Sequence, residues 1–279
     1  FPNSIGFSKV FMILLTGYQG FIGSHFRKAL GEEGQHKVIG IDQDNAWEFL
    51  RKFDQWKNVT LIVHNGAISS TTEKNWMTIA HYNQDFTAHL FAKAMEYEIP
   101  IKYASSASVY GNQKKNRKLI NPLNQYAISK LIIDYYVLDH IDKFKSIQGF
   151  RYFNVYGEGE DHKGDQASPV SKFTKQIKET GELKLFEGSD KFYRDFVWVK
   201  DVVDVVLNNT AGSGIYDVGT GKPTSFQKVA ELVAKKEKGT IKMIPFPKHL
   251  KGKYQDYTCA DNSWYEHDYT SVGRYLGSE

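Results

Sequence analysis

A tyrosine and a lysine four residues apart are the side chains best suited to proton transfer. Tyr126-Ala-Ile-Ser-Lys130 puts a phenol and an ammonium on one face of a helix. A nearby ammonium favours the phenolate, so we expect Lys130 to lower the pKa of Tyr126 toward neutrality. The same spacing also occurs by chance in ordinary packed or exposed helices, so the interpretation depends on the surrounding sequence.

A serine-rich segment supplies a third polar group. Ser105-Ser106-Ala-Ser108 follows directly on an expected strand at residues 101–104. Ser106 can donate a hydrogen bond to a reacting oxygen, as an oxyanion-stabilising group does. We expect Ser105 and Ser108 to be bonded to the backbone instead. With Tyr126 and Lys130, Ser106 completes a set of groups that handle protons.

A glycine-rich turn predicts a binding site for a dinucleotide. Gly17, Gly20 and Gly23 follow an apolar run at residues 11–15, which is typical of a strand buried on both faces. Glycines at this point let a pyrophosphate approach the N–H groups at a helix N-terminus. Asp42 ends the next expected strand, where an acidic residue about 20 residues after the last glycine binds the adenosine ribose.

The residues near Asp42 leave the choice of dinucleotide open. A carboxylate repels the 2′-phosphate of NADP, so Asp42 by itself favours NAD. Arg51 and Lys52 follow in an expected helix and would offset that repulsion if either lay close. A solvated helix face is at least as good an interpretation of these two cations. Either dinucleotide would bring a positive nicotinamide that adds to the effect of Lys130 on Tyr126.

The order of the expected elements indicates the fold class. Strands and helices alternate through the first half, which predicts an α/β fold with a Rossmann-type, doubly wound parallel sheet. The segment between Asp42 and the strand at 61–63 has room for one helix but hardly for another strand. We therefore expect the usual third, edge strand to be missing and the adenine pocket to be unusually open. The expected strands are 11–15, 37–41, 61–63, 101–104 and 148–152, and the expected helices are 21–30, 46–53, 75–97 and 126–141.

After Tyr156 the alternation breaks at a loop rich in glycine and charge. We expect a dinucleotide-binding domain over residues 11–156, to which residues 194–209 return. Residues 157–193 and 210–279 would form a smaller, mixed substrate lobe.

Composition argues against several classes of protein. A formal charge of +4 on 279 residues is too small to suggest a nucleic-acid binder. No apolar run approaches the roughly 18 residues that span a membrane, and residues 1–10 do not make a convincing signal peptide. Cys259 is the single cysteine, so neither an internal disulfide nor a cysteine-based metal site is expected. We expect a cytoplasmic protein with no metal and neither nucleic acid nor membrane as a partner.

Together these motifs resemble the extended short-chain dehydrogenase/reductase family. The three glycines, Ser106 at a strand end, and Tyr126 with Lys130 carry the resemblance. Longer stretches are similar to the ADP-heptose 6-epimerases within that family, and several of them lie in the expected substrate lobe. The stretches are 64–73, 103–106, 151–157, 162–164, 185–189, 194–197, 245–247 and 250–255.

The resemblance implies both chemistry and partners. It implies a bound NADP, with NAD possible, an ADP-linked sugar as substrate, and a homo-oligomer. Ser106, Tyr126 and Lys130 would form the catalytic triad, and Lys163 would be a second acid/base. By itself Lys163 looks like an exposed loop lysine, but epimerisation through a ketone requires proton delivery on either face of the carbonyl.

The resemblance also implies individual contacts. Asn83 would hold the helix that presents the triad. Cofactor contacts are implied at Gly17, Gln19, Gly20, Phe21, Ile22, Gly23, Asp42, Gln43, Ala67, Asn83, Tyr126 and Lys130. Substrate contacts are implied at Ser70, Thr71, Ser106, Asn154, His162, Lys163, Phe186, Arg194 and Tyr254.

The expected reaction is transient oxidation of the heptose C6 alcohol, followed by return of the hydride to the other face. Dehydratases of the family carry an acidic residue after the catalytic hydroxyl. Ala107 stands there in this sequence, so dehydration is disfavoured. Two alternatives remain: a hexose 4-epimerase with the same chemistry, and an idle dinucleotide-binding module, to which the shortened adenosine region gives some weight.

Overall fold

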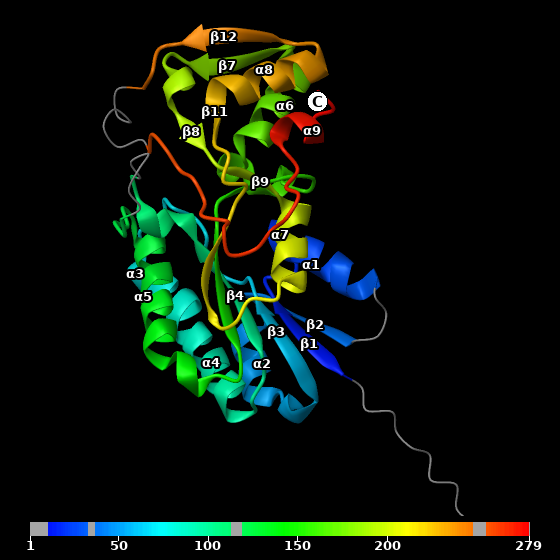
Figure 1. Cartoon of the computed structure of the whole chain (residues 1–279), viewed down its shortest axis with the longest axis vertical. Helices are drawn as coiled ribbons and strands as arrows, with labels where there is room; N and C mark the ends of the chain where they lie inside the picture. Colours follow the sequence, from blue (N-terminus) through cyan, green and yellow to red (C-terminus); the bar gives the residue numbers. More distant parts are fainter. Residues whose placement is uncertain (1–10, 33–36, 113–118, 248–254, 279) are drawn as a thin grey trace, which may run out of the picture.

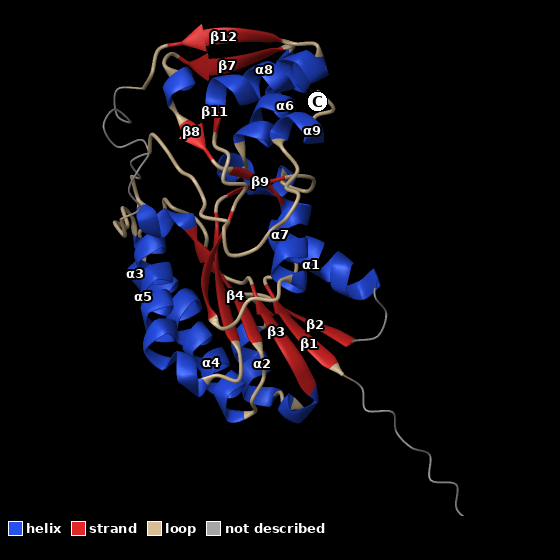
Figure 2. Cartoon of the chain, viewed as in Figure 1, coloured by secondary structure: helices blue, strands red, loops and turns tan. Residues whose placement is uncertain are grey.

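A computed structural model of the chain has a large parallel sheet flanked by helices and a smaller lobe above it (Figure 1, Figure 2). The structure describes residues 11–32, 37–112, 119–247 and 255–278. Tyr254, expected to contact the substrate, lies outside the described residues. No helix in the described ranges is long and apolar enough to cross a membrane.

The main sheet has six parallel strands in the order β10-β5-β4-β3-β1-β2. This arrangement confirms the predicted Rossmann-type fold. All five residues of β1 are buried, because a central parallel strand is covered on both faces. The strands are β1 (Met12–Thr16), β2 (Lys37–Ile41), β3 (Val59–His64), β4 (Ile101–Ser106), β5 (Ile147–Tyr152) and β10 (Gly214–Val218).

Helices cover both faces of this sheet (Figure 1). Successive side chains of a strand point to opposite faces, and β1 therefore feeds two separate cores. Met12 and Leu14 pack with α2 (Ala46–Lys52), α4 (Phe86–Glu96) and α5 (Gln125–His140). Ile13 and Leu15 pack with α1 (Phe21–Glu32) and α7 (Val199–Asn208).

The predicted loss of the edge strand is confirmed. Between Asp42 and Val59, where every residue is described, the chain forms α2 and a short 3-10 turn (Trp56–Asn58) but no strand. The segment is too short for both a helix and a strand, so β2 forms the edge of the sheet.

The helix expected over residues 75–97 has its predicted extent, but its middle turns are π-helical. It comprises α3 (Trp76–Ile79), a π-helical segment (Ala80–Asp85) and α4. Such wide turns often occur at functional sites, because they rotate one side chain away from the normal helical face. Here the buried residue of the π-helical segment is Asn83.

Residues 214–218 correct the expected domain boundary. The sequence predicts that these residues belong to the smaller lobe. In the structure they form β10, which pairs in parallel with β5 and extends the main sheet. The intervening chain leaves the sheet through the lobe and returns along α7, which provides the crossover that parallel strands need. The tail also returns to the main sheet, since the Trp264 indole N–H donates to the Asp217 carbonyl at 2.7 Å.

The smaller lobe is built around two helices, α6 (Pro169–Thr180) and α8 (Phe226–Glu237), which share one core. Strands β7 (Glu182–Phe186) and β12 (Thr240–Ile244) pair in parallel above them (Figure 2). Short pairs join the lobe to the sheet: β6 (Asn154–Tyr156) with β9 (Phe196–Trp198), and β8 (Tyr193–Arg194) with β11 (Thr224–Ser225). The short helix α9 (Val272–Tyr275) ends the described chain.

Candidate active site

A cavity of about 640 Å³ lies at the carboxyl ends of the central strands, below the smaller lobe. This is where ligands bind in open α/β sheets. The structure brings most of the predicted site residues to its wall. They are Gly17, Gly20, Phe21, Ile22, Gly23, Asp42, Gln43, Ala67, Ser70, Ser106, Tyr126, Lys130, Asn154, His162 and Lys163.

Three residues expected to contact the substrate do not line this cavity. Thr71 is an exposed turn residue. Phe186 lies at the end of β7, with its ring centre 5.6 Å from that of Phe246. Arg194 is buried in β8 and lies 5.4 Å from the ring centre of Phe226. Both of these side chains contact aromatic rings of the lobe instead.

The glycine-rich turn fits a pyrophosphate because a Cβ would fill it. Gly17 has a φ of +69°, and a Cβ there would lie 2.8 Å from the backbone nitrogen of Gly66. A Cβ on Gly23 would collide with the Gly17 carbonyl. The turn is therefore closed tightly against the start of α1, and the N–H groups of that helix terminus face the cavity.

The adenosine end of the cavity is defined by Asp42. Its Oδ2 accepts the Gln19 backbone N–H at 3.0 Å, so Gln19 acts through Asp42 rather than from the cavity wall. Burial raises the pKa of Asp42, and the Gln19 N–H opposes that effect. Neither cation considered for NADP lines the cavity: Arg51 is exposed, and Lys52 pairs with Glu48 at 2.5 Å.

The first turns of α5 present Tyr126 and Lys130. Asn124 caps the helix by accepting the Ala127 N–H at 2.9 Å, which starts the helix just before Tyr126. Lys130 is buried and donates from Nζ to the Ala104 carbonyl at 2.7 Å, which ties α5 to the end of β4. Burial lowers the pKa of Lys130 to about 8.

The pKa of Tyr126 differs from the expectation. Burial raises it and the charge of Asp134 adds to the rise, while a hydrogen bond with Ser106 lowers it. Lys130 does not offset the burial, because its Nζ is bonded to Ala104 and lies 6.0 Å from the centre of the phenol ring. Positive charge brought to the cavity near the phenol would favour the Tyr126 phenolate.

The neighbouring serines are also bonded differently from the expectation. Ser108 donates to Ser106 Oγ both from its backbone N–H, at 3.1 Å, and from its hydroxyl, at 2.8 Å. Ser105 donates its hydroxyl to the buried carboxylate of Asp134 at 2.9 Å. Both hydroxyls thus reach side chains instead of the backbone, and they fix the strand end from which Ser106 enters the cavity.

Asn83 connects the cavity wall to the catalytic helix. Its side chain accepts the Ile68 N–H at 2.7 Å and donates to the Ile68 carbonyl at 3.0 Å. It also donates to Ser129 Oγ at 3.0 Å, next to Lys130 in the chain. Asn83 lies behind the cavity rather than in its wall, so its contacts agree with a supporting role.

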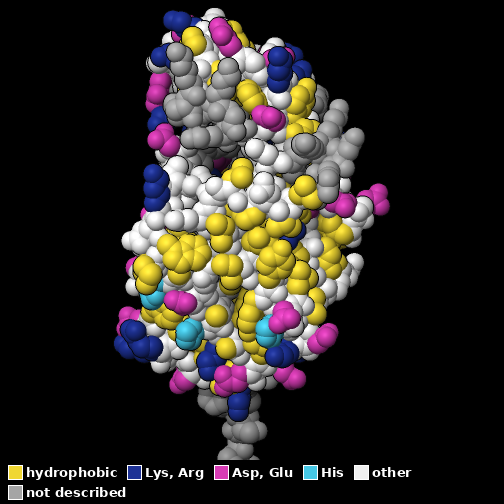
Figure 3. Space-filling model, turned by 90° about the vertical axis from the view of Figure 1, so that its left-hand side faces the viewer, with side chains coloured by type: hydrophobic (Ala, Val, Ile, Leu, Met, Phe, Trp, Pro, Cys, Tyr) yellow, Lys and Arg dark blue, Asp and Glu magenta, His cyan; other side chains and the backbone are white. Residues whose placement is uncertain are grey.

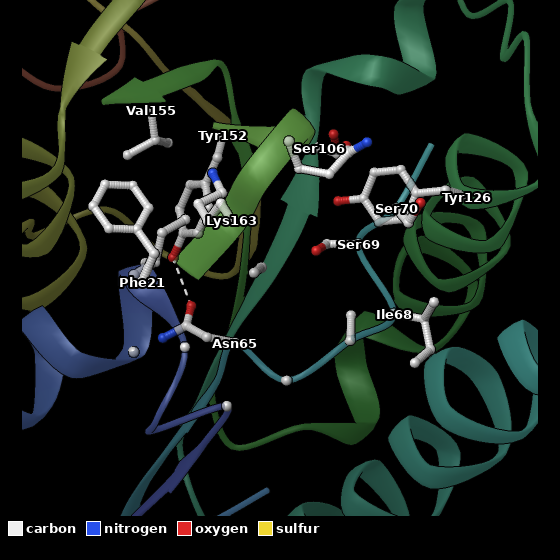
Figure 4. A pocket seen from close by; sticks show the side chains of 18 of the residues that line it. Phe21, Asn65, Ile68, Ser69, Ser70, Ser106, Tyr126, Tyr152, Val155 and Lys163 are labelled. Atoms are coloured by element: carbon white, nitrogen blue, oxygen red, sulfur yellow. Dashed lines mark hydrogen bonds between the residues drawn. The ribbon is translucent and has the colours of Figure 1, made fainter. Parts of the chain in front are cut away.

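Lys163 reaches the cavity from the other side. It belongs to a 3-10 segment (Asp161–Gln166) and is only 26% exposed, so it is not the solvated lysine that its loop position suggests. Its Nζ lies 4.9 Å from the ring centre of Phe21. In Figure 4 the Tyr126 hydroxyl points into the cavity from one side, and Lys163 lies on the opposite side.

Sequence reasoning missed several polar residues of the cavity wall, two of which are bonded to each other. Tyr152, at the end of β5, donates to Asn65 Oδ1 at 3.1 Å, and both line the cavity (Figure 4). The Asn65 side-chain nitrogen is buried and has no hydrogen-bond partner among the described residues. Tyr152 and Asn65 both lie in stretches that resemble the ADP-heptose 6-epimerases, and this resemblance is the one feature of the sequence that marks them as site residues.

A family model described as the NAD dependent epimerase/dehydratase family matches residues 13–219. The chain belongs to this family. Members use a nicotinamide dinucleotide, and the glycine turn and Asp42 provide a site that fits one. Among solved structures, the chain is similar to ADP-L-glycero-D-manno-heptose-6-epimerase from Helicobacter pylori, with 28% identity, a TM-score of 0.77 and 85% of each chain covered.

Two further epimerase structures share the fold of this family member. One is UDP-N-acetylglucosamine 4-epimerase from Methanobrevibacter ruminantium M1, with 20% identity, a TM-score of 0.81, and coverage of 97% of this chain and 98% of that one. The other is UDP-glucose 4-epimerase from Thermotoga maritima, with 23% identity, a TM-score of 0.81 and 96% of each chain covered. The protein is thus an epimerase/dehydratase family member, and the structures similar to it include epimerases that act on different nucleotide sugars.

Proposed function

We propose that the protein is a nucleotide-sugar epimerase that inverts C6 of ADP-glycero-manno-heptose through a transient ketone. The observation that carries this proposal is the position of Tyr126 and Lys163, which reach one cavity from opposite sides (Figure 4). Inversion requires the hydride to return to the opposite face of the ketone, so the sugar must turn over in the cavity. An acid/base on each side of the cavity can serve the reacting oxygen in both orientations of the sugar. The 28% identity to a heptose 6-epimerase supports the choice of sugar.

The chain's own residues would handle the protons. A nicotinamide dinucleotide held by the glycine turn and Asp42 would supply reversible hydride transfer at C6, and its positive charge would favour the Tyr126 phenolate. Tyr126 takes the proton of the C6 hydroxyl, while Ser106 donates a hydrogen bond to the same oxygen. After the sugar presents its other face, Lys163 gives a proton to the carbonyl oxygen. Exchange with solvent then restores both groups, and no net oxidation occurs.

The proposed cofactor is NAD, in contrast to the NADP that the resemblance implies. A 2′-phosphate next to Asp42 would need a cation to offset the carboxylate. The described lysines of the cavity wall are Lys130 on α5 and Lys163 on the loop below the lobe. Asp42 follows β2, which lies three strands from β4 in the sheet. Mass spectrometry of the gently denatured protein identifies a retained dinucleotide, and NADP would contradict this assignment.

We propose that the protein is a homo-oligomer that packs through α5. Ile128, Ile132, Tyr135 and Leu138 form a stripe along this helix, each between 39% and 56% exposed. Apolar side chains gather on this face of the molecule (Figure 3). A contiguous apolar surface of this kind is unusual on a monomer. Light scattering should give a multimer, and Tyr135→Glu should reduce it to a monomer.

The deciding experiment is to incubate the protein with one C6 epimer of ADP-heptose and follow C6 by NMR. Both epimers should appear without added cofactor if the dinucleotide is retained. UDP-glucose, tested in parallel, distinguishes the hexose 4-epimerase alternative, since its C4 should stay unchanged. An absence of interconversion of either sugar, with the dinucleotide shown to be bound, would refute the proposal and favour the idle binding module.

A further inference from the structure

Glu160 is a buried carboxylate at the base of the loop that carries Lys163. It is 2% exposed and does not line the cavity. Its Oε1 accepts the Gly157 N–H at 3.1 Å and the Ser168 hydroxyl at 2.7 Å, and its Oε2 accepts the Ser168 N–H at 2.6 Å. Ser168 is the N-cap of α6, so this charge lies at the positive end of a helix of 12 residues.

The same carboxylate faces the proposed second acid/base. Lys163 Nζ lies 3.8 Å from Glu160 Oε2, and the Lys163 backbone N–H donates to the Glu160 carbonyl at 2.9 Å. The aromatic ring of Phe21 bounds the ammonium on its other side. Glu160 is thus anchored by three hydrogen bonds from elsewhere in the loop and from α6, and Lys163 rests between it and the first residue of α1.

We infer that Glu160 is a positioning residue for Lys163. The Glu160 carboxylate holds the Lys163 ammonium between α6 and α1 and maintains its positive charge beside the cavity. This inference rests on the proposed function, in which Lys163 exchanges a proton with the sugar. Glu160 itself would touch neither substrate nor cofactor, because it lies behind the cavity wall. A lysine in this position without a fixed anion would lose its charge too readily to act as the acid.

The charges around Lys163 agree with this role. Burial lowers the pKa of Lys163, the Glu160 carboxylate raises it, and the ammonium of Lys172 on α6 lowers it. Lys172 is held at a distance by donating to the Asp165 carbonyl at 2.6 Å. On the side of α1 the uncharged ring of Phe21 faces Lys163, and the His25 ring lies beyond it, 5.7 Å from that of Phe21. Glu160 is therefore the one group among these that favours the charged lysine.

The test measures the charge of Lys163 without any substrate. Reductive methylation at a series of pH values, followed by peptide mass spectrometry, gives the pH at which Lys163 becomes half reactive. An opposite charge within about 4–6 Å typically moves a pKa by about 1–3 units, so Glu160→Gln should lower this midpoint by about one pH unit or more. Glu158→Gln is the matched control, because Glu158 is exposed in the same loop; its midpoint should equal that of the wild type.

Catalysis provides the second readout. If the chain epimerises its sugar, Glu160→Gln should move the alkaline limb of the kcat profile to lower pH by the same amount and change KM little. An unchanged methylation midpoint in a folded Glu160→Gln variant would overturn the inference. Should that variant not fold, Glu160→Asp decides the question, because the shorter side chain retains the charge at α6 but withdraws it from Lys163. A lower methylation midpoint of Lys163 in this variant supports the inference, and an unchanged midpoint refutes it. A failed proposed function would leave the methylation result intact.

Discussion

Replacing Lys130 with methionine should stabilise the dinucleotide-free protein at neutral pH while it abolishes turnover. Burial lowers the pKa of Lys130 from 10.5 to about 8, so at pH 7 the folded chain holds an ammonium that its surroundings disfavour. At about 1.4 kcal/mol per pH unit, that difference amounts to about 3 kcal/mol. Removing the lysine also leaves the Ala104 carbonyl without its donor, which costs about 1–2 kcal/mol. The net gain for Lys130→Met should be about 1–2 kcal/mol.

The gain should depend on pH in a defined direction. Between pH 8 and 10.5 the unfolded chain holds more protons on Lys130 than the folded chain, so the stability of the wild type rises with pH in this window. The variant lacks this effect. Its advantage should therefore be complete below pH 8, shrink by about 1.4 kcal/mol per pH unit above it and disappear near about pH 9.

Urea unfolding at pH 7 and at pH 10 tests this reasoning. Lys143→Met is the control, because Lys143 is exposed just after α5 and should change the free energy of unfolding by less than about 0.5 kcal/mol at either pH. The reasoning is refuted if Lys130→Met is less stable than the wild type at pH 7, or if its difference from the wild type is the same at both pH values.

Three further substitutions test the site. Tyr126→Phe should lower kcat by about 10²–10⁴-fold with an unchanged melting temperature, because it removes a general acid/base. Full activity of this variant in the NMR assay of C6 would contradict the prediction. Asn83→Ala removes three hydrogen bonds of a buried side chain and should cost about 3 kcal/mol and about 6–12 °C in Tm. Asn208→Ala removes one exposed hydrogen bond and should cost less than about 0.5 kcal/mol. Equal losses from the two would refute the role of Asn83. Asp42→Asn should lower the ratio of NAD to NADP affinity by about tenfold in calorimetry, because it removes the carboxylate that repels the 2′-phosphate; an unchanged ratio would count against NAD.

Several predicted residues that the structure brings to the cavity are marked by local properties of the chain. Gly17 and Gly23 stand where a Cβ would strike the backbone, so residue type alone marks that turn. Tyr126 and Lys130 share a helix, and their spacing brings them together wherever the helix lies. Phe186 and Arg194 were placed at the site by resemblance, and the lobe's own packing holds them outside the cavity wall.

What the sequence determined by itself is the Rossmann-type order of strands and helices, the glycine turn and the absence of an edge strand. Apolar runs, the positions of glycines and the length of a segment are properties of the sequence that do not depend on how the chain packs. Tertiary structure alone decided that residues 214–218 join the main sheet, because a short strand of this kind suits either sheet until its partner is known. It also decided the acid–base character of the site: burial raises the pKa of Tyr126, and a carboxylate three residues from Lys163 becomes its buried counter-charge. Charge states depend on what surrounds a group in space, and only the folded chain defines those surroundings.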